Sequence, residues 1–328
     1  MFSPMAGTVA VEDPHDDEAE SEILVNQNVL ISTGSKPRQL PFVPFDHKVV
    51  LSSDDMMELE DIPESIAIIG GGVIGLEFAS MLNDLGSEVT VLEAGADILP
   101  NEDKDVSGAL KKSLTEKGIH FETGVSLNEN NVNVEDDSVK ISLDNEMTFD
   151  KVLVAIGRSP NIDDIGMTNT KIEMDNGFIK TNEYYQTKDN NIYAVGDCIG
   201  NLQLAHVASK EAINAVIHMA DSDPYQLNYN QVPRCIYTSP EVASIGQTEA
   251  QLKAQDIEFK SHKIPLNAIG KAVIEGNKNG FGKILVDPDT KGILGVSLVG
   301  PNVTELINEV ALAQFLDASA LELGTSVH

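Results

Sequence analysis

A glycine-rich loop between an apolar run and a helical pattern constrains this chain more than any other feature. The run Ser65–Ile69 has the composition of a buried strand, and Gly70, Gly72 and Gly75 follow it in the spacing G-x-G-x-x-G. Apolar residues then recur at helical spacing, at Leu76, Phe78, Ala79, Leu82 and Leu85. The next apolar run ends on an acid, Glu93, 23 positions after Gly70. Strand, glycine turn, helix, strand and acid in this order are typical of a dinucleotide-binding unit.

Each glycine of this loop has its own physical role. Gly70 permits a tight turn from strand to helix, Gly72 leaves room for a pyrophosphate to approach the backbone, and Gly75 lets the helix pack closely on the strand. The helix start offers free N–H groups and the positive end of a helix dipole to the phosphates. We therefore expect the phosphate-binding loop to consist of Gly70, Gly71, Gly72, Val73, Ile74 and Gly75.

Glu93 stands where an acid can accept hydrogen bonds from ribose hydroxyl groups. A carboxylate there repels a 2′-phosphate, so the sequence favours NAD(H) over NADP(H). The alternative is a tight strand-to-helix turn that binds no ligand. A lone glycine motif would leave that alternative open, but here both strands, the helix and the acid stand at the right spacing and favour a binding loop.

The overall charge limits the partners that we expect. The chain has 22 basic and 52 acidic residues, a formal net charge of −30, which argues against binding to nucleic acid or to an anionic membrane surface. No apolar run reaches the length of a membrane span, and the first residues lack the pattern of a signal peptide. We expect a cytoplasmic protein.

The cysteines and histidines do not indicate a metal site. Cys198 and Cys235 fit neither a C-x-x-C redox pair nor a zinc site, and the seven histidines form no H-x-x-x-H or Cys/His cluster. A chain with so few cysteines is typical of a reducing compartment. We expect no bound metal.

The first half of the chain reads as two parts. Residues 1–36 carry short strand-like runs, at Thr8–Glu12, Ile23–Val25 and Asn28–Ile31, and are interpreted as the remnant of a larger sheet. Residues 37–156 open with a proline-rich connector and contain the dinucleotide-binding unit. After the glycine loop this unit is predicted to contain a helix at 105–117, a strand at 119–121, a hairpin of 132–134 with 139–143, and a buried strand at 150–156.

The second half also reads as two parts. Residues 157–227 include a strand that ends in Gly196-Asp197 and a helix predicted over Ala205–Met219. Residues 228–328 mix strands and helices as an α+β domain does. Its strands are predicted at 235–238, 243–247, 259–264, 282–286 and 293–299, and its helices at 248–254 and 303–316.

Several motifs stand in one order along the chain. They are Ile31-Ser32-Thr33-Gly34-Ser35-Lys36-Pro37, the glycine loop with Glu93, Ala155-Ile156-Gly157-Arg158-Ser159-Pro160-Asn161, Tyr193-Ala194-Val195-Gly196-Asp197, the stretch 237–246 and the stretch 295–300. In this order they resemble the flavin-dependent pyridine nucleotide–disulfide oxidoreductases, over nearly the whole chain from about Val29. Within that family they are most similar to the dihydrolipoyl dehydrogenase branch.

The resemblance implies a fold, cofactors and partners. The fold would be α/β, with Rossmann-like FAD- and NAD(P)-binding domains and a C-terminal α+β dimerisation domain. Residues 1–36 and 157–227 would then belong to the FAD-binding domain, 37–156 to the NAD-binding domain and 228–328 to the dimerisation domain. The cofactors would be FAD and NAD, and the partners a second copy of the chain and the lipoyl-bearing E2 component of a 2-oxoacid dehydrogenase complex.

The resemblance also assigns roles to matching residues. Asp197 would accept hydrogen bonds from the ribityl chain of the flavin, although an aspartate there can equally cap the helix that follows. Gly157 would border the nicotinamide, and Arg158 fits an ion pair as readily as a ligand contact. The remaining flavin contacts would come from Thr33, Gly34, Leu204, Ala205 and His206.

The sequence departs from the family pattern in three places. A complete member opens with a further glycine fingerprint for the flavin and carries a redox disulfide in C-x-x-x-x-C spacing, whereas Cys198 and Cys235 are 37 positions apart. The family's catalytic base is a histidine in a His-Pro-Thr stretch, and His328 resembles the residue before it. We therefore interpret the chain as trimmed at both ends and assign no catalytic residue.

Two functions of different class remain open at this point. One is an oxidoreductase that passes electrons from dihydrolipoamide through FAD to NAD⁺, for which this chain alone is expected to be inactive. Mercuric reductase and NADH oxidase are alternatives within the family. The other is a non-catalytic module that only binds NAD or a protein partner, and bound flavin is the observation that separates the two.

Overall fold

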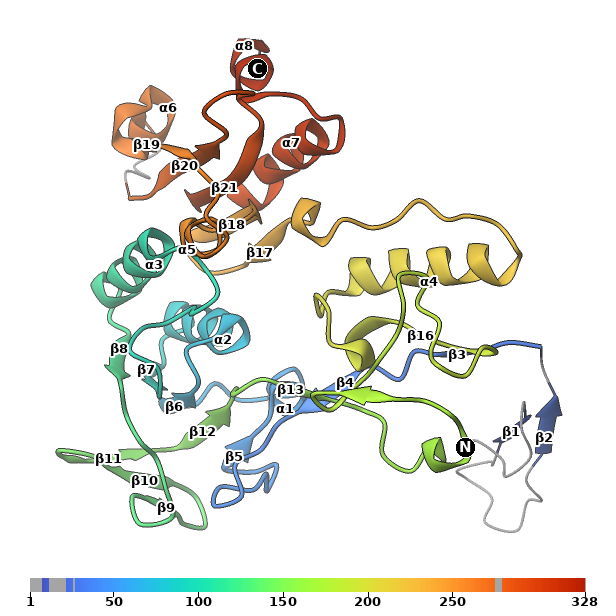
Figure 1. Cartoon of the computed structure of the whole chain (residues 1–328). Helices are drawn as coiled ribbons and strands as arrows, with labels where there is room; N and C mark the ends of the chain where they lie inside the picture. Colours follow the sequence, from blue (N-terminus) through green and yellow to red (C-terminus); the bar gives the residue numbers. More distant parts are fainter. Residues whose placement is uncertain (1–7, 12–21, 26, 275–278, 328) are drawn as a thin grey trace. The chain divides into compact units, whose positions relative to one another are not determined.

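The structure is a computed structural model that describes residues 8–11, 22–25, 27–274 and 279–327. The chain divides into two compact units (Figure 1). The first unit comprises Met1–Lys36 and Arg158–Tyr229, and the second comprises Pro37–Gly157 and Asn230–His328. Both units therefore contain segments that are far apart in the sequence.

A five-stranded parallel sheet lies at the centre of the second unit. Its strands are, in spatial order, β5 (Val50–Leu51), β12 (Lys151–Val154), β6 (Ser65–Ile69), β7 (Glu88–Glu93) and β8 (His120–Thr123). Alternate residues of β6 face opposite sides, with Ile66 and Ile68 in one apolar cluster and Ala67 and Ile69 in another. Both faces of the sheet are therefore covered, as parallel sheets require.

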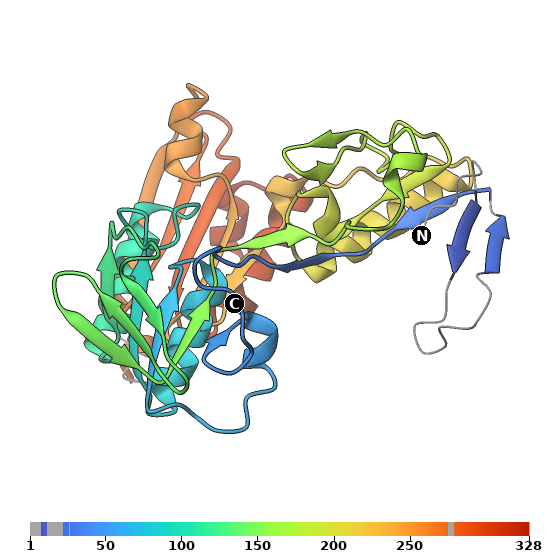
Figure 2. The same ribbon diagram turned by 90° about the horizontal axis from the view of Figure 1, so that it is seen from below.

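Helices cover one face of this sheet and a small antiparallel sheet covers the other (Figure 1, Figure 2). Leu76 and Leu82 of α2 (Val73–Asp84) and Leu110 of α3 (Lys104–Glu116) pack against β6 and β7. The opposite layer consists of β9 (Val132–Val134), β10 (Val139–Ser142) and β11 (Glu146–Phe149).

The C-terminal part of the second unit is built on a five-stranded antiparallel sheet. Its order is β17 (Arg234–Ile236), β18 (Glu241–Gly246), β21 (Ile293–Gly300), β20 (Phe281–Val286) and β19 (Lys260–Pro265). One face shares the apolar cluster of α2 and α3, and α7 (Val303–Phe315) packs on the other through Ile307 and Val310. The short helices of this part are α5 (Glu249–Ala254), α6 (Gly270–Ile274) and α8 (Ala320–Thr325).

The first unit is centred on two parallel strands, β3 (Val29–Ile31) and β16 (Ile192–Ala194), with helix α4 (Ala205–Met219) against them. Its core includes Ile31, Tyr193 and Ala215. Three two-stranded sheets complete the unit, formed by β1 (Thr8–Val11) with β2 (Glu22–Val25), β4 (Ser35–Pro37) with β13 (Arg158–Pro160), and β14 (Met174–Asp175) with β15 (Phe178–Ile179). Single 3₁₀ turns lie at Met167–Asn169 and Gly196–Ile199 here and at Leu266–Ala268 in the second unit, and a further one, Tyr229–Gln231, spans the boundary between the units in the sequence.

Most predicted elements are present near their predicted bounds. The strand Ser65–Ile69 and the helix Ala205–Met219 are confirmed residue for residue. The prediction missed β11, the short strands β4, β5, β13, β14 and β15, and three short helices. The missed helices are α1 (Ser53–Met56), α6 and α8, of which α1 and α8 each begin with a capping box, Ser52 with Asp55 and Ser319 with Glu322. Glu12, the last residue of the first predicted strand, lies outside the described residues.

Candidate functional site

The glycine loop has the geometry that its spacing predicts. Gly70 has φ +118°, and a Cβ atom on it would lie 2.3 Å from the carbonyl oxygen of Ala155, the residue after β12. A Cβ atom on Gly75 would lie 2.2 Å from the carbonyl oxygen of Gly70, so α2 packs directly on the turn. Gly72 differs from both, because a Cβ atom there would meet nothing within 4 Å. The loop is therefore closed behind Gly70 and Gly75 and open at Gly72.

The N-terminus of α2 offers its first N–H groups to this open side. Gly72 is the N-cap residue, and its extended backbone carries no side chain that could cap the helix. The first turn contains no acid, Val73 is exposed and Ile74 is half-buried. A helix start of this kind is suited to an anion, because the N–H groups and the helix dipole both favour negative charge.

Glu93 is tied to the loop by its side chain. It is the last residue of β7, and its Oε2 accepts a hydrogen bond from the Gly71 amide at 2.6 Å. Its Oε1 accepts one from the Gly95 amide at 2.5 Å. A carboxylate has about four acceptor positions, so both oxygens of this half-buried group can still accept hydroxyl groups.

Gly157 lies at the same edge of the parallel sheet. It follows β12, the neighbour of β6 that leads into Gly70, and both strands end at this edge. Gly157 is exposed, has φ +110° and has no atom within 4 Å of a Cβ position. The structure thus brings the loop, Glu93 and Gly157 together at the carboxyl edge of the sheet, where open α/β sheets bind ligands.

Asp197 lies at the corresponding edge of the first unit. It follows β16 in a 3₁₀ turn, and its Oδ2 accepts a hydrogen bond from the Ser35 hydroxyl at 2.5 Å. Arg158 donates from Nε to the same hydroxyl at 2.6 Å and from a terminal nitrogen to the Ser35 carbonyl at 2.9 Å. Asp197 and Arg158 are therefore linked through Ser35.

The other predicted flavin contacts lie beside this link or at the start of α4. Thr33 and Gly34 follow β3, the parallel neighbour of β16, and the Gly34 carbonyl accepts the Asn161 amide at 2.9 Å. Leu204 is the N-cap residue of α4 and makes no side-chain cap. Ala205 and His206 are exposed in the first turn.

Sequence reasoning missed a buried acid in the first unit. Glu211 of α4 is fully buried, its Oε2 accepts the Gly196 amide at 2.7 Å, and its Oε1 accepts the Tyr229 hydroxyl at 2.6 Å. The Tyr229 hydroxyl in turn accepts a hydrogen bond from the Asn201 side chain at 2.8 Å. Burial raises the pKa of Glu211 above its ordinary value, despite the hydrogen bonds from Tyr229 and Gly196 that favour the ionised form. This network fixes the residue immediately before Asp197.

Two further observations concern the remaining candidates. Cys198 is buried and Cys235 is half-buried, both as free thiols, and burial raises the pKa of each. His328 lies outside the described residues. Within residues 8–11, 22–25, 27–274 and 279–327, no group of three His, Cys, Asp or Glu side chains is placed to hold a metal ion, and no helix is long and apolar enough to cross a membrane.

Family comparison covers almost the whole chain. Residues 3–212 match the pyridine nucleotide-disulphide oxidoreductase family, and residues 232–328 match the dimerisation domain of that family. Dihydrolipoyl dehydrogenase from Bacillus subtilis (strain 168) is 46% identical over 333 residues, covering 100% of this chain and 70% of the relative. Dihydrolipoyl dehydrogenase from Chlamydia muridarum is 40% identical over 297 residues, covering 89% of this chain and 63% of the relative.

Solved structures share the fold. LpdA from Mycobacterium tuberculosis superposes with a TM-score of 0.88 at 25% identity, covering 98% of this chain and 72% of that one. The HOCl-induced flavoprotein disulfide reductase RclA from Escherichia coli, in its Cu(II) complex, gives a TM-score of 0.88 at 25% identity, covering 98% of this chain and 73% of that one.

These comparisons confirm the resemblance that the ordered motifs indicate, together with the α/β fold class and its dimerisation domain. The chain spans 63% to 70% of the length of the two curated relatives described above. It belongs to the pyridine nucleotide-disulphide oxidoreductase family of NAD-dependent enzymes, whose cofactors are FAD and NAD(H), and the relatives that it matches there are dihydrolipoyl dehydrogenases.

Proposed function

We propose that the second unit binds NAD(H) at the glycine loop. The observation that carries this proposal is the open space at Gly72 beside the uncapped N-terminus of α2. The pyrophosphate would accept N–H groups of the loop Gly70–Gly75, and Glu93 would accept the ribose hydroxyl groups. Gly157 at the same edge would border the nicotinamide. These residues fit the dinucleotide, because the donors that a phosphate needs and the acid that a ribose needs lie on adjacent strand ends.

The test is a calorimetric titration of the purified chain with NADH and, separately, with NADPH. NADH should bind, and NADPH should bind more weakly because the Glu93 carboxylate repels the 2′-phosphate. Absence of NADH binding up to millimolar concentration would refute the proposal, and a preference for NADPH would refute the role of Glu93.

The first unit is proposed to hold one side of a flavin. The donor set fits the ribityl side, because Asp197 supplies carboxylate oxygens at the end of β16 and the start of α4 carries no side-chain cap. Thr33, Gly34, Leu204, Ala205 and His206 would line the same site. Bound FAD supplies the carrier that passes two electrons between a thiol substrate and NAD⁺.

We further propose that the function served is dihydrolipoyl dehydrogenase-type electron transfer, from dihydrolipoamide to NAD⁺. The supporting observation is identity to proteins of that name combined with the open glycine loop beside Glu93. A visible absorption spectrum before and after addition of NADH separates this from a module that only binds NAD. A flavin band that bleaches supports the oxidoreductase, and a colourless chain that still binds NADH supports the module.

The proposed partner is a second copy of the chain, docked on the outer face of α7. The matched dimerisation domain supports this, as do exposed apolar side chains on α7 and in the residues after it, at Leu306, Leu312, Phe315, Leu316 and Leu321. Exposed apolar side chains of this size are often buried in protein interfaces. Leu312→Asp should shift the chain towards monomer in analytical ultracentrifugation, and an unchanged sedimentation coefficient would contradict this face.

The lipoyl-bearing E2 component of a 2-oxoacid dehydrogenase complex remains part of the proposal, as the partner whose dithiol the enzyme oxidises. The proposal also includes a cytoplasmic location. The two cysteines support that location, because both are free thiols in the structure, as expected in a reducing compartment.

A further inference from the structure

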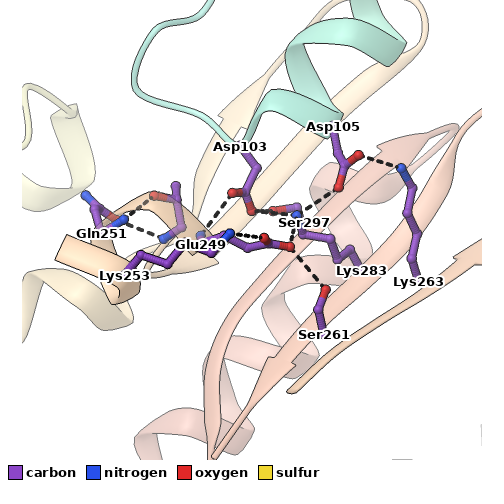
Figure 3. Close-up of polar contacts among 10 residues, drawn as sticks. Asp103, Asp105, Glu249, Gln251, Lys253, Ser261, Lys263, Lys283 and Ser297 are labelled. Carbon is purple, nitrogen blue, oxygen red and sulfur yellow. Dashed lines mark hydrogen bonds and ion pairs between the residues drawn. The ribbon is translucent and has the colours of Figure 1, made fainter. Parts of the chain in front are cut away.

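A buried lysine joins the dinucleotide-binding part of the second unit to its C-terminal sheet. Lys283 of β20 is only 3% exposed, and its Nζ lies 3.1 Å from Asp103, 3.0 Å from Asp105 and 3.0 Å from Glu249 (Figure 3). Asp103 and Asp105 begin helix α3, and Glu249 begins helix α5. Three carboxylates from two elements therefore converge on one ammonium group of a third.

The positive and negative charges of this cluster balance. Lys263 pairs with Asp105 at 3.0 Å and Lys253 pairs with Glu249 at 3.0 Å, so three ammonium groups face three carboxylates (Figure 3). Burial works against the charged form of Lys283, but its hydrogen bonds to Asp105 and Glu249 outweigh it and raise its pKa. A buried carboxylate that loses its ionic partner destabilises the folded state. Removal of Lys283 would leave the buried Asp103 carboxylate without its ammonium partner.

The Asp103 side chain forms its hydrogen bonds within this cluster and does not cap its own helix. Asp103 is the N-cap residue of α3 but makes no side-chain cap. Its Oδ1 instead accepts the Glu249 amide at 3.0 Å, and its Oδ2 accepts the Ser297 hydroxyl of β21 at 3.5 Å. The start of α3 is thus fixed from outside, by groups of the C-terminal sheet and α5.

The segment before Asp103 leads directly back to the glycine loop. The Leu99 amide donates to the Gly71 carbonyl at 3.0 Å, while the Leu99 carbonyl accepts the Glu102 amide at 3.0 Å and the Ser107 hydroxyl at 3.3 Å. Gly71 is held on its other side by Glu93. Hydrogen bonds therefore join the loop backbone to Leu99, and join Leu99 to the turn that ends at Asp103.

We propose that Lys283 is a positioning residue for the dinucleotide loop. By fixing Asp103 and Asp105 it holds the turn from Leu99 to Asp103, and this turn holds the Gly71 carbonyl and so the direction of the neighbouring loop amides. The proposal rests on the proposed NAD(H) site for its functional consequence. It assigns Lys283, in the C-terminal sheet, a role at a ligand site that it does not touch.

The test compares three variants of the full chain. Lys283→Met removes the charge but keeps much of the volume. Asp103→Asn weakens the same link while keeping an oxygen for the Glu249 amide, and it carries the test if Lys283→Met fails to fold. Lys263→Met is the matched control, because Lys263 is 42% exposed and pairs with Asp105 but not with Asp103 or Glu249 in the cluster. Its ammonium group also lies 4.0 Å from the centre of the Phe281 ring, and a methionine side chain can still pack on that ring.

The first readout is hydrogen exchange of the Leu99 amide, with the Val152 amide of β12 as the reference for global unfolding. The Val152 amide donates to the Val49 carbonyl at 2.9 Å, away from the cluster. Lys283→Met and Asp103→Asn should speed exchange at Leu99 about tenfold relative to Val152, whereas Lys263→Met should leave the ratio within about twofold. Equal acceleration at Leu99 and Val152, or none at Leu99, would overturn the proposal.

The second readout is the Kd for NADH, which should rise about tenfold in Lys283→Met and Asp103→Asn and stay within about twofold in Lys263→Met. Faster Leu99 exchange with an unchanged Kd would overturn the link from Lys283 to the ligand. If the unaltered chain binds no NADH, the proposed function fails by itself. The exchange ratio still decides whether Lys283 positions Leu99, so the two failures are distinguishable.

Discussion

The Glu93 carboxylate accepts the Gly71 amide at 2.6 Å and thereby fixes the glycine loop to the end of β7. The acid thus has a structural role in addition to the one proposed towards the ribose. Its other oxygen accepts the Gly95 amide, so the side chain is oriented before any ligand arrives. A preorganised acid of this kind lowers the ordering cost of binding.

Glu93→Gln should lower both stability and discrimination between the two dinucleotides. Glutamine has one acceptor oxygen for two amides, so an unpaired N–H should cost about 1–3 kcal/mol of unfolding free energy. Loss of the negative charge should narrow the preference for NADH over NADPH by about tenfold, which is ~1.4 kcal/mol. Denaturant unfolding and the two Kd values measure these effects. Glu88→Gln, at the exposed start of the same strand, is the control, and an unchanged preference in Glu93→Gln would contradict the role.

The two glycines Gly72 and Gly75 should respond to alanine in opposite ways. A Cβ atom on Gly75 would lie 2.2 Å from the Gly70 carbonyl oxygen, so Gly75→Ala should destabilise the chain by about 1–3 kcal/mol. Gly72 has φ −81° and open space, so Gly72→Ala should fold normally yet weaken NADH binding at least about tenfold by obstructing the pyrophosphate. Melting temperatures and calorimetry check the pair. Normal NADH affinity in Gly72→Ala would show that the ligand does not approach there.

The buried Glu211 should give the chain a characteristic pH dependence. Burial raises the pKa of Glu211 in the folded state, so the folded chain binds this proton more tightly than the unfolded chain does. Stability from this group is therefore present below its ordinary pKa of 4.5 and is lost as pH rises through the raised value. Glu211→Gln should remove that loss, so urea unfolding should favour the variant increasingly from acid towards neutral pH. A constant difference between the two proteins across this range would contradict it.

The 328-residue chain should show negligible oxidation of dihydrolipoamide when supplied with NAD⁺. A thiol relay needs an accessible thiolate, and burial raises the pKa of both Cys198 and Cys235. The rate of NADH formation, followed by ultraviolet absorbance, measures the reaction. Turnover at a substantial rate would contradict the prediction, and its loss in Cys198→Ala or Cys235→Ala would contradict this account of the thiols.

Local patterns explain why the geometry of the glycine loop could be predicted. The roles of Gly70, Gly72 and Gly75 depend on backbone within one strand-turn-helix unit, so their spacing alone indicates the geometry found. The hydrogen bond from the Gly71 amide to Glu93 is less obvious, but it joins two ends of adjacent parallel strands that the same pattern places together.

Contacts between distant segments explain why the burial of Glu211 and Lys283 could not be predicted from the sequence. Glu211 occupies a position in α4 that reads as an ordinary polar residue, and its partners Gly196 and Tyr229 are not helix neighbours. Lys283 likewise reads as a solvated residue of a strand, since its partners Asp103 and Glu249 lie far away in the sequence, at the starts of α3 and α5. The short helices α1 and α8 could have been predicted from their capping boxes, which set the start of a helix even where no apolar period is long enough to show.

The most direct test of the NAD(H) site is hydrogen exchange of the whole chain with and without NADH. Protection should appear in peptides that cover Gly70–Gly75 and Glu93, while peptides from α7 should exchange at the same rate in both conditions. Protection that is confined to other elements, or absent from the glycine loop at saturating NADH, would contradict the site.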